Sequence, residues 1–127
     1  MMVMIVSIPG ELPDLNTYIN KQRANRFYGN KIKQEATELV EWYCKGKSKI
    51  TKYPINITFN WYCKSKRKDK DNIRFGAKFI LDGMQKAGII RNDGWSEIGS
   101  LVDNYYVDKK NPRIEVEISN QTNVFNN

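Results

Sequence analysis

Two aspartates lie two residues apart inside the most basic segment of the chain. Asp69 and Asp71 are separated by Lys70, and five of the seven positions from 64 to 70 are basic (Lys64, Lys66, Arg67, Lys68 and Lys70). A third acid, Asp93, follows about one helix later in a turn with Asn92 and Gly94. Grouped carboxylates repel one another unless a cation joins them, and their oxygens suit Mg²⁺ or Mn²⁺. Because clustered cations attract a polyanion, the combination predicts metal-dependent chemistry on a nucleic-acid backbone.

The spacing of these residues indicates how they could act together. Side chains two apart in an extended segment point the same way, so Asp69 and Asp71 can face one cavity. If a helix starts near Asp71, Lys78 lies two turns further along nearly the same face, with Arg74 and Asp82 one turn to either side. A metal held by such acids can orient a water and stabilise both oxygens at phosphorus, and a nearby lysine can offset charge on the phosphate.

Each of these residues also has an ordinary structural explanation. An aspartate before a helix, such as Asp71, is a common N-cap, and Asp93 with Gly94 is a common turn pair. Lys78 and Asp82 could form a surface ion pair of small energetic weight, and the basic run could be a solvated loop. The hypothesis of phosphoryl chemistry therefore depends on the combination rather than on any single residue.

Composition narrows the functional classes. A chain of 127 residues is the size of one domain, and its net charge of +7 with a pI near 9.4 favours nucleic acid as partner. There is no histidine, which excludes Ser-His-Asp and Cys-His catalysis and histidine-containing zinc sites. Cys44 and Cys63 fit no metal-binding spacing and are expected to be reduced core residues. The apolar run 1–8 is too short to span a bilayer and lacks a basic leader, so we expect a cytoplasmic protein without membrane contact.

The periodicity of apolar residues predicts alternating strands and helices. The expected elements are a strand over 3–8, a helical region over about 17–45 broken at 29–30, a strand over 55–61, a helix over about 72–87, and strands over 101–107 and 114–118. This order, β-α-β-α-β-β, predicts a single α+β domain with two helices packed on a mixed sheet of about four strands. The domain is expected to cover 1–119, followed by a polar C-terminal tail over 120–127.

Three segments in this order resemble the RusA family of crossover-junction endodeoxyribonucleases: 69–72 (Asp-Lys-Asp-Asn), 78–84 (Lys-Phe-Ile-Leu-Asp-Gly-Met) and 87–93 (Ala-Gly-Ile-Ile-Arg-Asn-Asp). The resemblance covers about residues 3 to 118, and 15–16 and 112–116 are similar to phage and prophage members. It implies a Mg²⁺-dependent homodimer that resolves four-way (Holliday) DNA junctions by paired symmetric nicks in recombination and repair, with Mn²⁺ as a possible substitute. Asp69, Asp71 and Asp93 match the metal-binding acids, and Lys78 matches the essential lysine.

This sequence departs from the family pattern in two places. Lys78 lies further from Asp71 than in the best-known members, and Asn92 replaces one acid of a closing pair. A non-catalytic DNA-binding protein of the same fold therefore stays open, as does a nuclease for flaps or forks. In each case the basic residues would contact DNA phosphates without reading sequence: Lys64, Lys66, Arg67, Lys68, Lys70 and Arg74.

Overall fold

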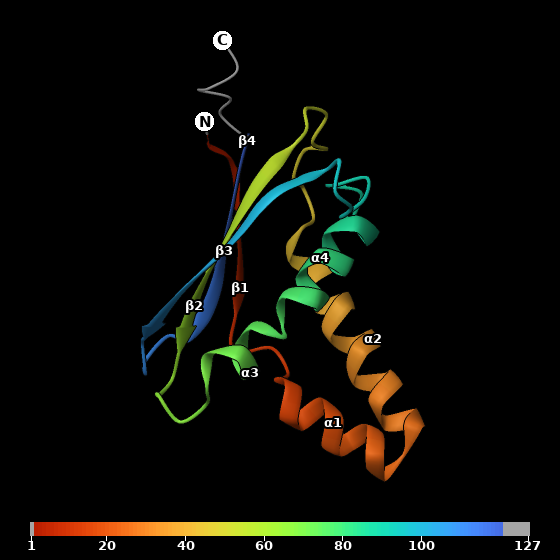
Figure 1. Cartoon of the computed structure of the whole chain (residues 1–127), viewed down its shortest axis with the longest axis vertical. Helices are drawn as coiled ribbons and strands as arrows, with labels where there is room; N and C mark the ends of the chain where they lie inside the picture. The colour runs from red at the N-terminus through yellow and green to blue at the C-terminus, as the bar shows by residue number, and fades with distance from the viewer. Residues whose placement is uncertain (1, 121–127) are drawn as a thin grey trace.

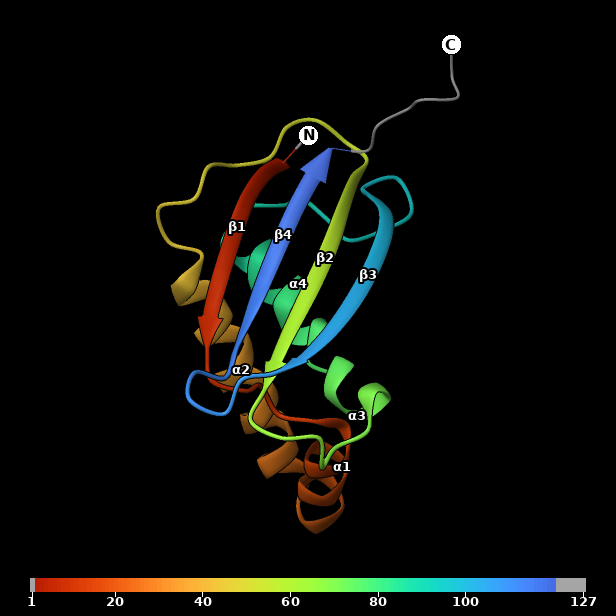
Figure 2. The same cartoon turned by 90° about the vertical axis from the view of Figure 1, so that its left-hand side faces the viewer.

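A computed structural model describes residues 2–120 and has the predicted α+β class. Its elements are β1 Met2–Pro9, α1 Leu15–Ala24, α2 Arg26–Tyr43, β2 Ile55–Cys63, α3 Lys70–Arg74, α4 Ala77–Lys86, β3 Ile98–Val107 and β4 Arg113–Asn120. The helices all lie on one side of the four-stranded sheet (Figure 1), and the opposite face carries no helix of the described chain (Figure 2). Within these residues no helix has both the length and the apolar character that crossing a bilayer requires.

The sheet is mixed, with the strand order β1-β4-β2-β3. β4 is antiparallel to both β1 and β2, whereas β2 and the edge strand β3 are parallel. Parallel neighbours need a crossover connection, and α3 and α4 provide it here. Because Cys63 pairs with Val107, the carboxyl ends of β2 and β3 lie at the same end of the sheet.

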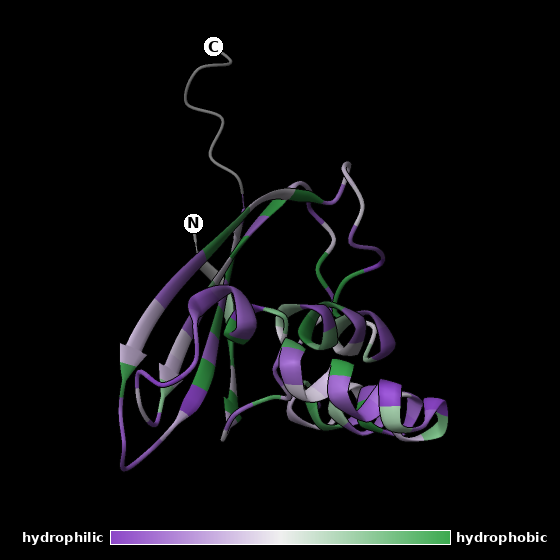
Figure 3. Cartoon of the chain, turned by 60° about the horizontal axis from the view of Figure 1, so that its bottom comes forward, coloured by the Kyte–Doolittle hydropathy of each residue, from purple (hydrophilic) through white to green (hydrophobic). Residues whose placement is uncertain are grey.

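The core lies between the sheet and the helices. Alternate residues of β2 are buried against the helices, as the alternating pattern of 55–61 predicted, and the same holds for β4 (Ile55, Ile57, Phe59 and Trp61; Ile114, Val116 and Ile118). Figure 3 shows hydrophobic and hydrophilic residues alternating along the strands. The two cysteines are unpaired and buried, as predicted, and burial raises the pKa of Cys44 to about 11.

Helices α2 and α4 pack closely at one glycine. A Cβ added at Gly83 would lie 2.5 Å from Cβ of Val40 and 2.9 Å from the carbonyl oxygen of Thr37. Val40 is fully buried in α2, so its side chain has no solvent into which it could move. The absence of a side chain at Gly83 therefore sets how near the crossover approaches α2.

Each of the two predicted helices is divided into two. The first breaks at Asn25, not at 29–30, because Asn25 is extended (φ −166°, ψ 125°) and its side chain accepts a hydrogen bond from the N–H of Phe27. Gly29 lies inside α2. The second is not continuous over 72–87, since α3 ends at Arg74 and α4 begins at Ala77.

The ends of the predicted segments also need correction. The third strand begins at Ile98 rather than at 101, and Asn120 ends β4 instead of beginning the tail. The remainder of the predicted tail, 121–127, lies outside the described residues.

The contact at Gly83 gives a test of the helix packing. We expect Gly83→Ala to lower the free energy of unfolding by about 1–2 kcal/mol, because overpacking outweighs the better helix propensity of alanine. Urea unfolding followed by circular dichroism measures the change. Lys86→Ala, at an exposed position of the same helix, should stay within about 0.5 kcal/mol of the parent. An equally stable Gly83→Ala protein would show that α2 and α4 are further apart.

Candidate active site

Asp69 and Asp71 lie where the chain leaves β2 and enters α3. Asp69 is the residue before α3, its backbone is extended, and its side chain makes no capping hydrogen bond. Asp71 is in the first turn, where its carboxylate accepts a hydrogen bond of 2.9 Å from the N–H of Asn72. Both side chains line one recess of about 670 Å³. Two exposed carboxylates thus share a space large enough for a ligand.

The walls of this recess come from the β2–α3 loop and from the carboxyl end of β3. Lys66, Lys68 and Lys70 line it together with Tyr105 and Tyr106. The hydroxyl of Tyr105 donates a hydrogen bond of 3.2 Å to the carbonyl of Lys70, which joins the start of α3 to the edge strand. Three cations and two carboxylates therefore surround the same opening.

An internal carboxylate, Asp103, holds the far end of α3. Its side chain is 15% exposed and accepts hydrogen bonds from the indole N–H of Trp61 at 2.8 Å and from Nε of Arg74 at 3.0 Å. Because Arg74 is the last residue of α3, this ion pair fixes the helix against β2 and β3. Sequence reasoning missed Asp103; the available signal was that it is the single charged residue of the strand 98–107.

The β2–α3 loop is also tied to the segment that follows β1. Two contacts come from the loop: an ion pair of 2.8 Å from Lys68 to Asp14, and a hydrogen bond of 3.1 Å from the N–H of Lys64 to Glu11. A third comes from α3, where the side chain of Asn72 accepts a hydrogen bond of 2.9 Å from the N–H of Asn16. These contacts join the acid-bearing loop to the start of α1. The loop is therefore held at both ends of its basic run.

Asp14 is the most buried acid of this region, at 4% exposed, and it also caps α1 by accepting from the N–H of Thr17 at 2.8 Å. Burial by itself raises the pKa of its carboxyl, but the ammonium of Lys68 and the Thr17 N–H together lower it further, so the pKa lies below the usual 3.8. The same ion pair raises the pKa of Lys68. Lys68 is therefore engaged in holding the loop.

The six cations predicted to contact DNA thus fall into two groups. Lys68 and Arg74 are each held by an acid. The other four are exposed and form no ion pair within residues 2–120 (Lys64, Lys66, Arg67 and Lys70). These four are the residues of the basic run whose charge is available to a polyanion.

The third predicted metal ligand, Asp93, lies at the other end of the sheet. It precedes β3, and the start of β3 adjoins the start of β2, where the N–H of Ile55 donates to the carbonyl of Glu97 at 2.8 Å. Asp69 and Asp71 follow the end of β2. Consequently, in the part of the chain that the structure describes, no three His, Cys, Asp or Glu side chains gather to hold a metal.

Lys78 is likewise separate from the recess. It is exposed in the first turn of α4, after the break at 75–76, and is not among the recess-lining residues. The donor set that one chain offers is the Asp69–Asp71 pair. Two carboxylates facing open space fit Mg²⁺, which keeps several waters and takes further oxygens from a substrate phosphate.

The Asp14–Lys68 ion pair predicts a pH-dependent stability. Since the folded pKa of Asp14 is depressed, its contribution is present above the unfolded pKa and is lost as pH falls through the lower, folded pKa. Asp14→Asn keeps a capping acceptor but removes the charge, so we expect about 1–2 kcal/mol less stability at neutral pH. Urea unfolding from neutral pH to about pH 2 should show this deficit disappear.

A matched control uses an exposed ion pair. Lys31 and Glu35 are 3.9 Å apart with both side chains mostly exposed, so Glu35→Gln should change stability by less than about 0.5 kcal/mol at every pH. A deficit of Asp14→Asn that persists at low pH would assign the effect to helix capping instead of the ion pair.

Comparison with known proteins places the chain in a family. Residues 9–119, nearly the whole chain, match the family model of endodeoxyribonuclease RusA. No curated protein matches the sequence. The match includes the β2–α3 loop, the crossover helices and both strands that follow, and it confirms the resemblance drawn from the segments 69–72, 78–84 and 87–93. The chain therefore belongs to the RusA family of junction-resolving endodeoxyribonucleases.

Proposed function

We propose that the protein is a Mg²⁺-dependent homodimer that resolves four-way DNA junctions by paired symmetric nicks, with Mn²⁺ as an alternative ion. The observation that carries this proposal is the sharing of one cation-lined recess by Asp69 and Asp71 in a chain of the RusA family. Carboxylates placed among lysines combine metal binding with attraction for a phosphodiester.

Within the proposed site, Asp69 and Asp71 hold Mg²⁺, which when bound supplies Lewis-acid stabilisation of phosphate oxygens and an activated water. Lys66 and Lys70 line the same recess and are free to bind the phosphate. Lys78, on α4, stays the predicted residue that offsets charge on the reacting phosphate. Asp103 acts through Arg74 and keeps α3, and with it Asp71, in place.

A second copy would explain the position of Asp93. β3 is an edge strand of ten residues with neither proline nor lysine, the residues that commonly block edge pairing. It exposes large apolar side chains on both faces (Leu101, Val102, Tyr106 and Val107). Trp95, two residues after Asp93, is fully exposed. Such an edge is suited to pairing with an identical strand.

Antiparallel pairing of two β3 strands about a two-fold axis would place the start of one strand beside the end of the other. The turn that carries Asp93 of one copy would then approach Tyr105 and Tyr106 of the other, which line the recess of Asp69 and Asp71. Each dimer would hold two composite sites, and a two-fold assembly suits two cuts on opposed strands.

The activity is tested on a labelled mobile four-way junction beside linear duplex and a fork, with Mg²⁺ or with EDTA. We expect paired symmetric nicks on the junction alone, abolished by EDTA and reduced at least about 100-fold in Asp71→Asn, because removal of a metal ligand costs several kcal/mol of transition-state stabilisation. Tight binding of the junction without cutting, in Mg²⁺ or in Mn²⁺, would show that the protein binds DNA but does not cleave it. Cutting of forks and duplex as well as the junction would support the nuclease activity but contradict the selectivity for junctions.

The composite arrangement is tested by mixing two inactive variants, Asp71→Asn and Asp93→Asn, and refolding them together. If Asp93 acts in the partner's site, each mixed dimer has one intact site. About half the dimers are mixed, so nicking should recover to about a quarter of the parent, on one strand at a time.

The matched control mixes Asp69→Asn with Asp71→Asn, which damages both sites in either arrangement and should stay inactive. An inactive mixture of Asp71→Asn with Asp93→Asn would contradict the composite site, as would full activity of Asp93→Asn by itself.

A further inference from the structure

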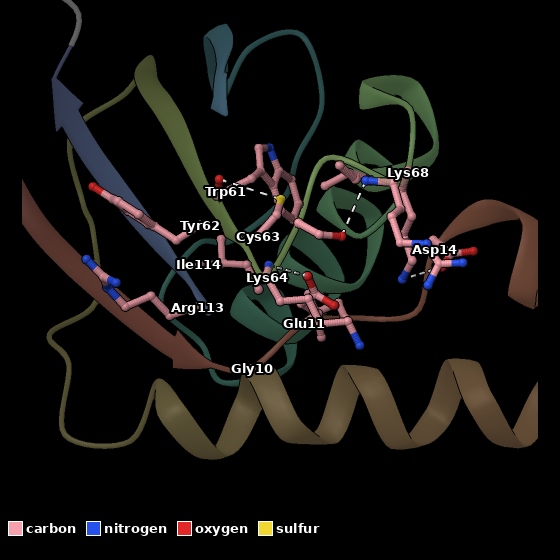
Figure 4. Close-up of a pocket in the computed structure, with 14 residues that line it drawn as sticks. Gly10, Glu11, Asp14, Trp61, Tyr62, Cys63, Lys64, Lys68, Arg113 and Ile114 are labelled. Atoms are coloured by element: carbon pink, nitrogen blue, oxygen red, sulfur yellow. Dashed lines mark hydrogen bonds and ion pairs between the residues drawn. The ribbon is translucent and has the colours of Figure 1, made fainter. Parts of the chain in front are cut away.

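A second cavity lies directly beside the recess, on the other side of the β2–α3 loop. Its volume is about 350 Å³, at the small end of the range for ligand sites. It opens at the carboxyl end of β2, between the β2–α3 loop, the segment after β1 and the first residues of β4 (Figure 4). Nothing in the proposed hydrolysis uses this space.

The inner wall of the cavity is apolar and belongs to the hydrophobic core. Trp61, Cys63 and Ile114 are almost completely buried yet face the space, and Leu12 closes it from the segment after β1. Trp61 cannot turn freely because its indole N–H is bonded to Asp103 and its ring stacks on Phe59, with centroids 5.7 Å apart. Trp61 is only 2% exposed, so a flat, apolar group that entered the cavity would be buried against an apolar wall of core residues and not stacked on the indole.

The rim of the cavity is basic. Lys64 and Arg67 line it and make no ion pair within the described residues, whereas Arg113, which lies over the ring of Tyr62 at 3.9 Å, is paired with Asp108 and Glu115. Two acids also reach the rim: Asp14 is paired with Lys68, and Glu11 accepts the backbone N–H of Lys64, so the two unpaired cations outnumber the one unpaired acid. The occupant should therefore combine a flat apolar part with a negatively charged part that stays outside.

The cavity and the recess share a wall. Cys63, Ser65, Lys68 and Ile73 line both spaces, so a strand with its phosphate in the recess would pass the mouth of the cavity. A nucleotide has the required chemistry, since its base is flat and apolar on its faces and its phosphate is anionic. A base costs least to move out of a stack when it has few pairing or stacking partners, and a base pair at a point of strand exchange has fewer stacking neighbours than one inside a continuous duplex.

We propose that this cavity is a subsite that takes up one unstacked nucleobase of branched DNA, next to the strand that is cut. The subsite rests on the proposed function for its biological use, but base uptake itself needs neither metal nor cleavage. Burial of the base against the apolar wall supplies the affinity, while Lys64 and Arg67 contact the flanking phosphates.

Binding is measured in EDTA with three labelled duplexes that differ at one position: fully paired, with a one-nucleotide bulge, and with an abasic bulge. We expect the base-containing bulge to bind at least about fivefold more tightly than the abasic one, as burial of roughly 40 Å² of apolar base surface would give. Equal affinity for both bulges would overturn the proposal.

A variant that fills the cavity sharpens the test. Leu12 lines the cavity but not the recess, so Leu12→Phe should erase the preference for the base while leaving affinity for the paired duplex unchanged, because the phosphate contacts remain. Leu12→Met keeps the side-chain volume and should retain the preference. Circular dichroism melting verifies that each variant is folded, and a folded filling variant that still prefers the base-containing bulge would contradict the subsite.

A photo-cross-link locates the base without any variant. A bulged 5-iodouracil, irradiated in the complex with the parent protein, should couple to residues 61–63 or 10–14. Coupling at β3 or at Trp95 would assign the base to another surface. Junction cleavage is scored separately: discrimination between bulges without cleavage would refute only the proposed function, and cleavage without discrimination would refute only the subsite.

Discussion

The parallel pairing of β2 with β3 is the constraint on which the rest of this structure depends. It requires a crossover, and the crossover contains α3, α4 and the acids that precede them. It places Asp69 and Asp71 at the carboxyl end of the sheet and Asp93 at the opposite end. It also leaves β3 at the edge, where its outer hydrogen-bonding groups have no strand partner within the described chain. The separation of Asp93 from the other two acids and the open edge of β3 therefore have the same cause, the parallel pairing of β2 with β3.

The cations of the basic region fall into two groups, those held in ion pairs within the fold and those exposed to solvent. Asp14 and Asp103 are largely shielded from solvent, and each holds one cation of the basic region, Lys68 or Arg74. These ion pairs lie where water is partly excluded, so they can position α3 and its loop more firmly than an exposed pair could. The remaining cations face solvent beside Asp69 and Asp71. A net charge alone would not distinguish the two groups, because burial decides which cations are already neutralised.

The recess and the cavity adjoin each other along one loop. The recess offers carboxylates and lysines, which suit a phosphodiester, whereas the cavity offers an apolar wall beneath a basic rim. Since the two share the residues of the loop between β2 and α3, the contacts of Lys68 and Asn72 with the start of α1 fix both. A single stiff loop could therefore couple the position of a base to that of the neighbouring phosphate.

Much of this protein is determined by short-range patterns in the sequence. The alternation in β2 and β4, the order of the elements, the buried reduced cysteines and the RusA resemblance of residues 69–93 all follow from local spacing and residue type. The break at Asn25 was missed because extended backbone and side-chain capping compete locally with helix formation. The break after Arg74 was missed because Phe75 and Gly76 keep helical backbone angles, and only the hydrogen bonds around them shift to the three-residue spacing. The bracing role of Asp103, the separation of Asp93 from the other acids, and the cavity beside the site were decided only by the tertiary structure. Each of these depends on which strands are neighbours and in which direction they run, and these properties join residues dozens of positions apart.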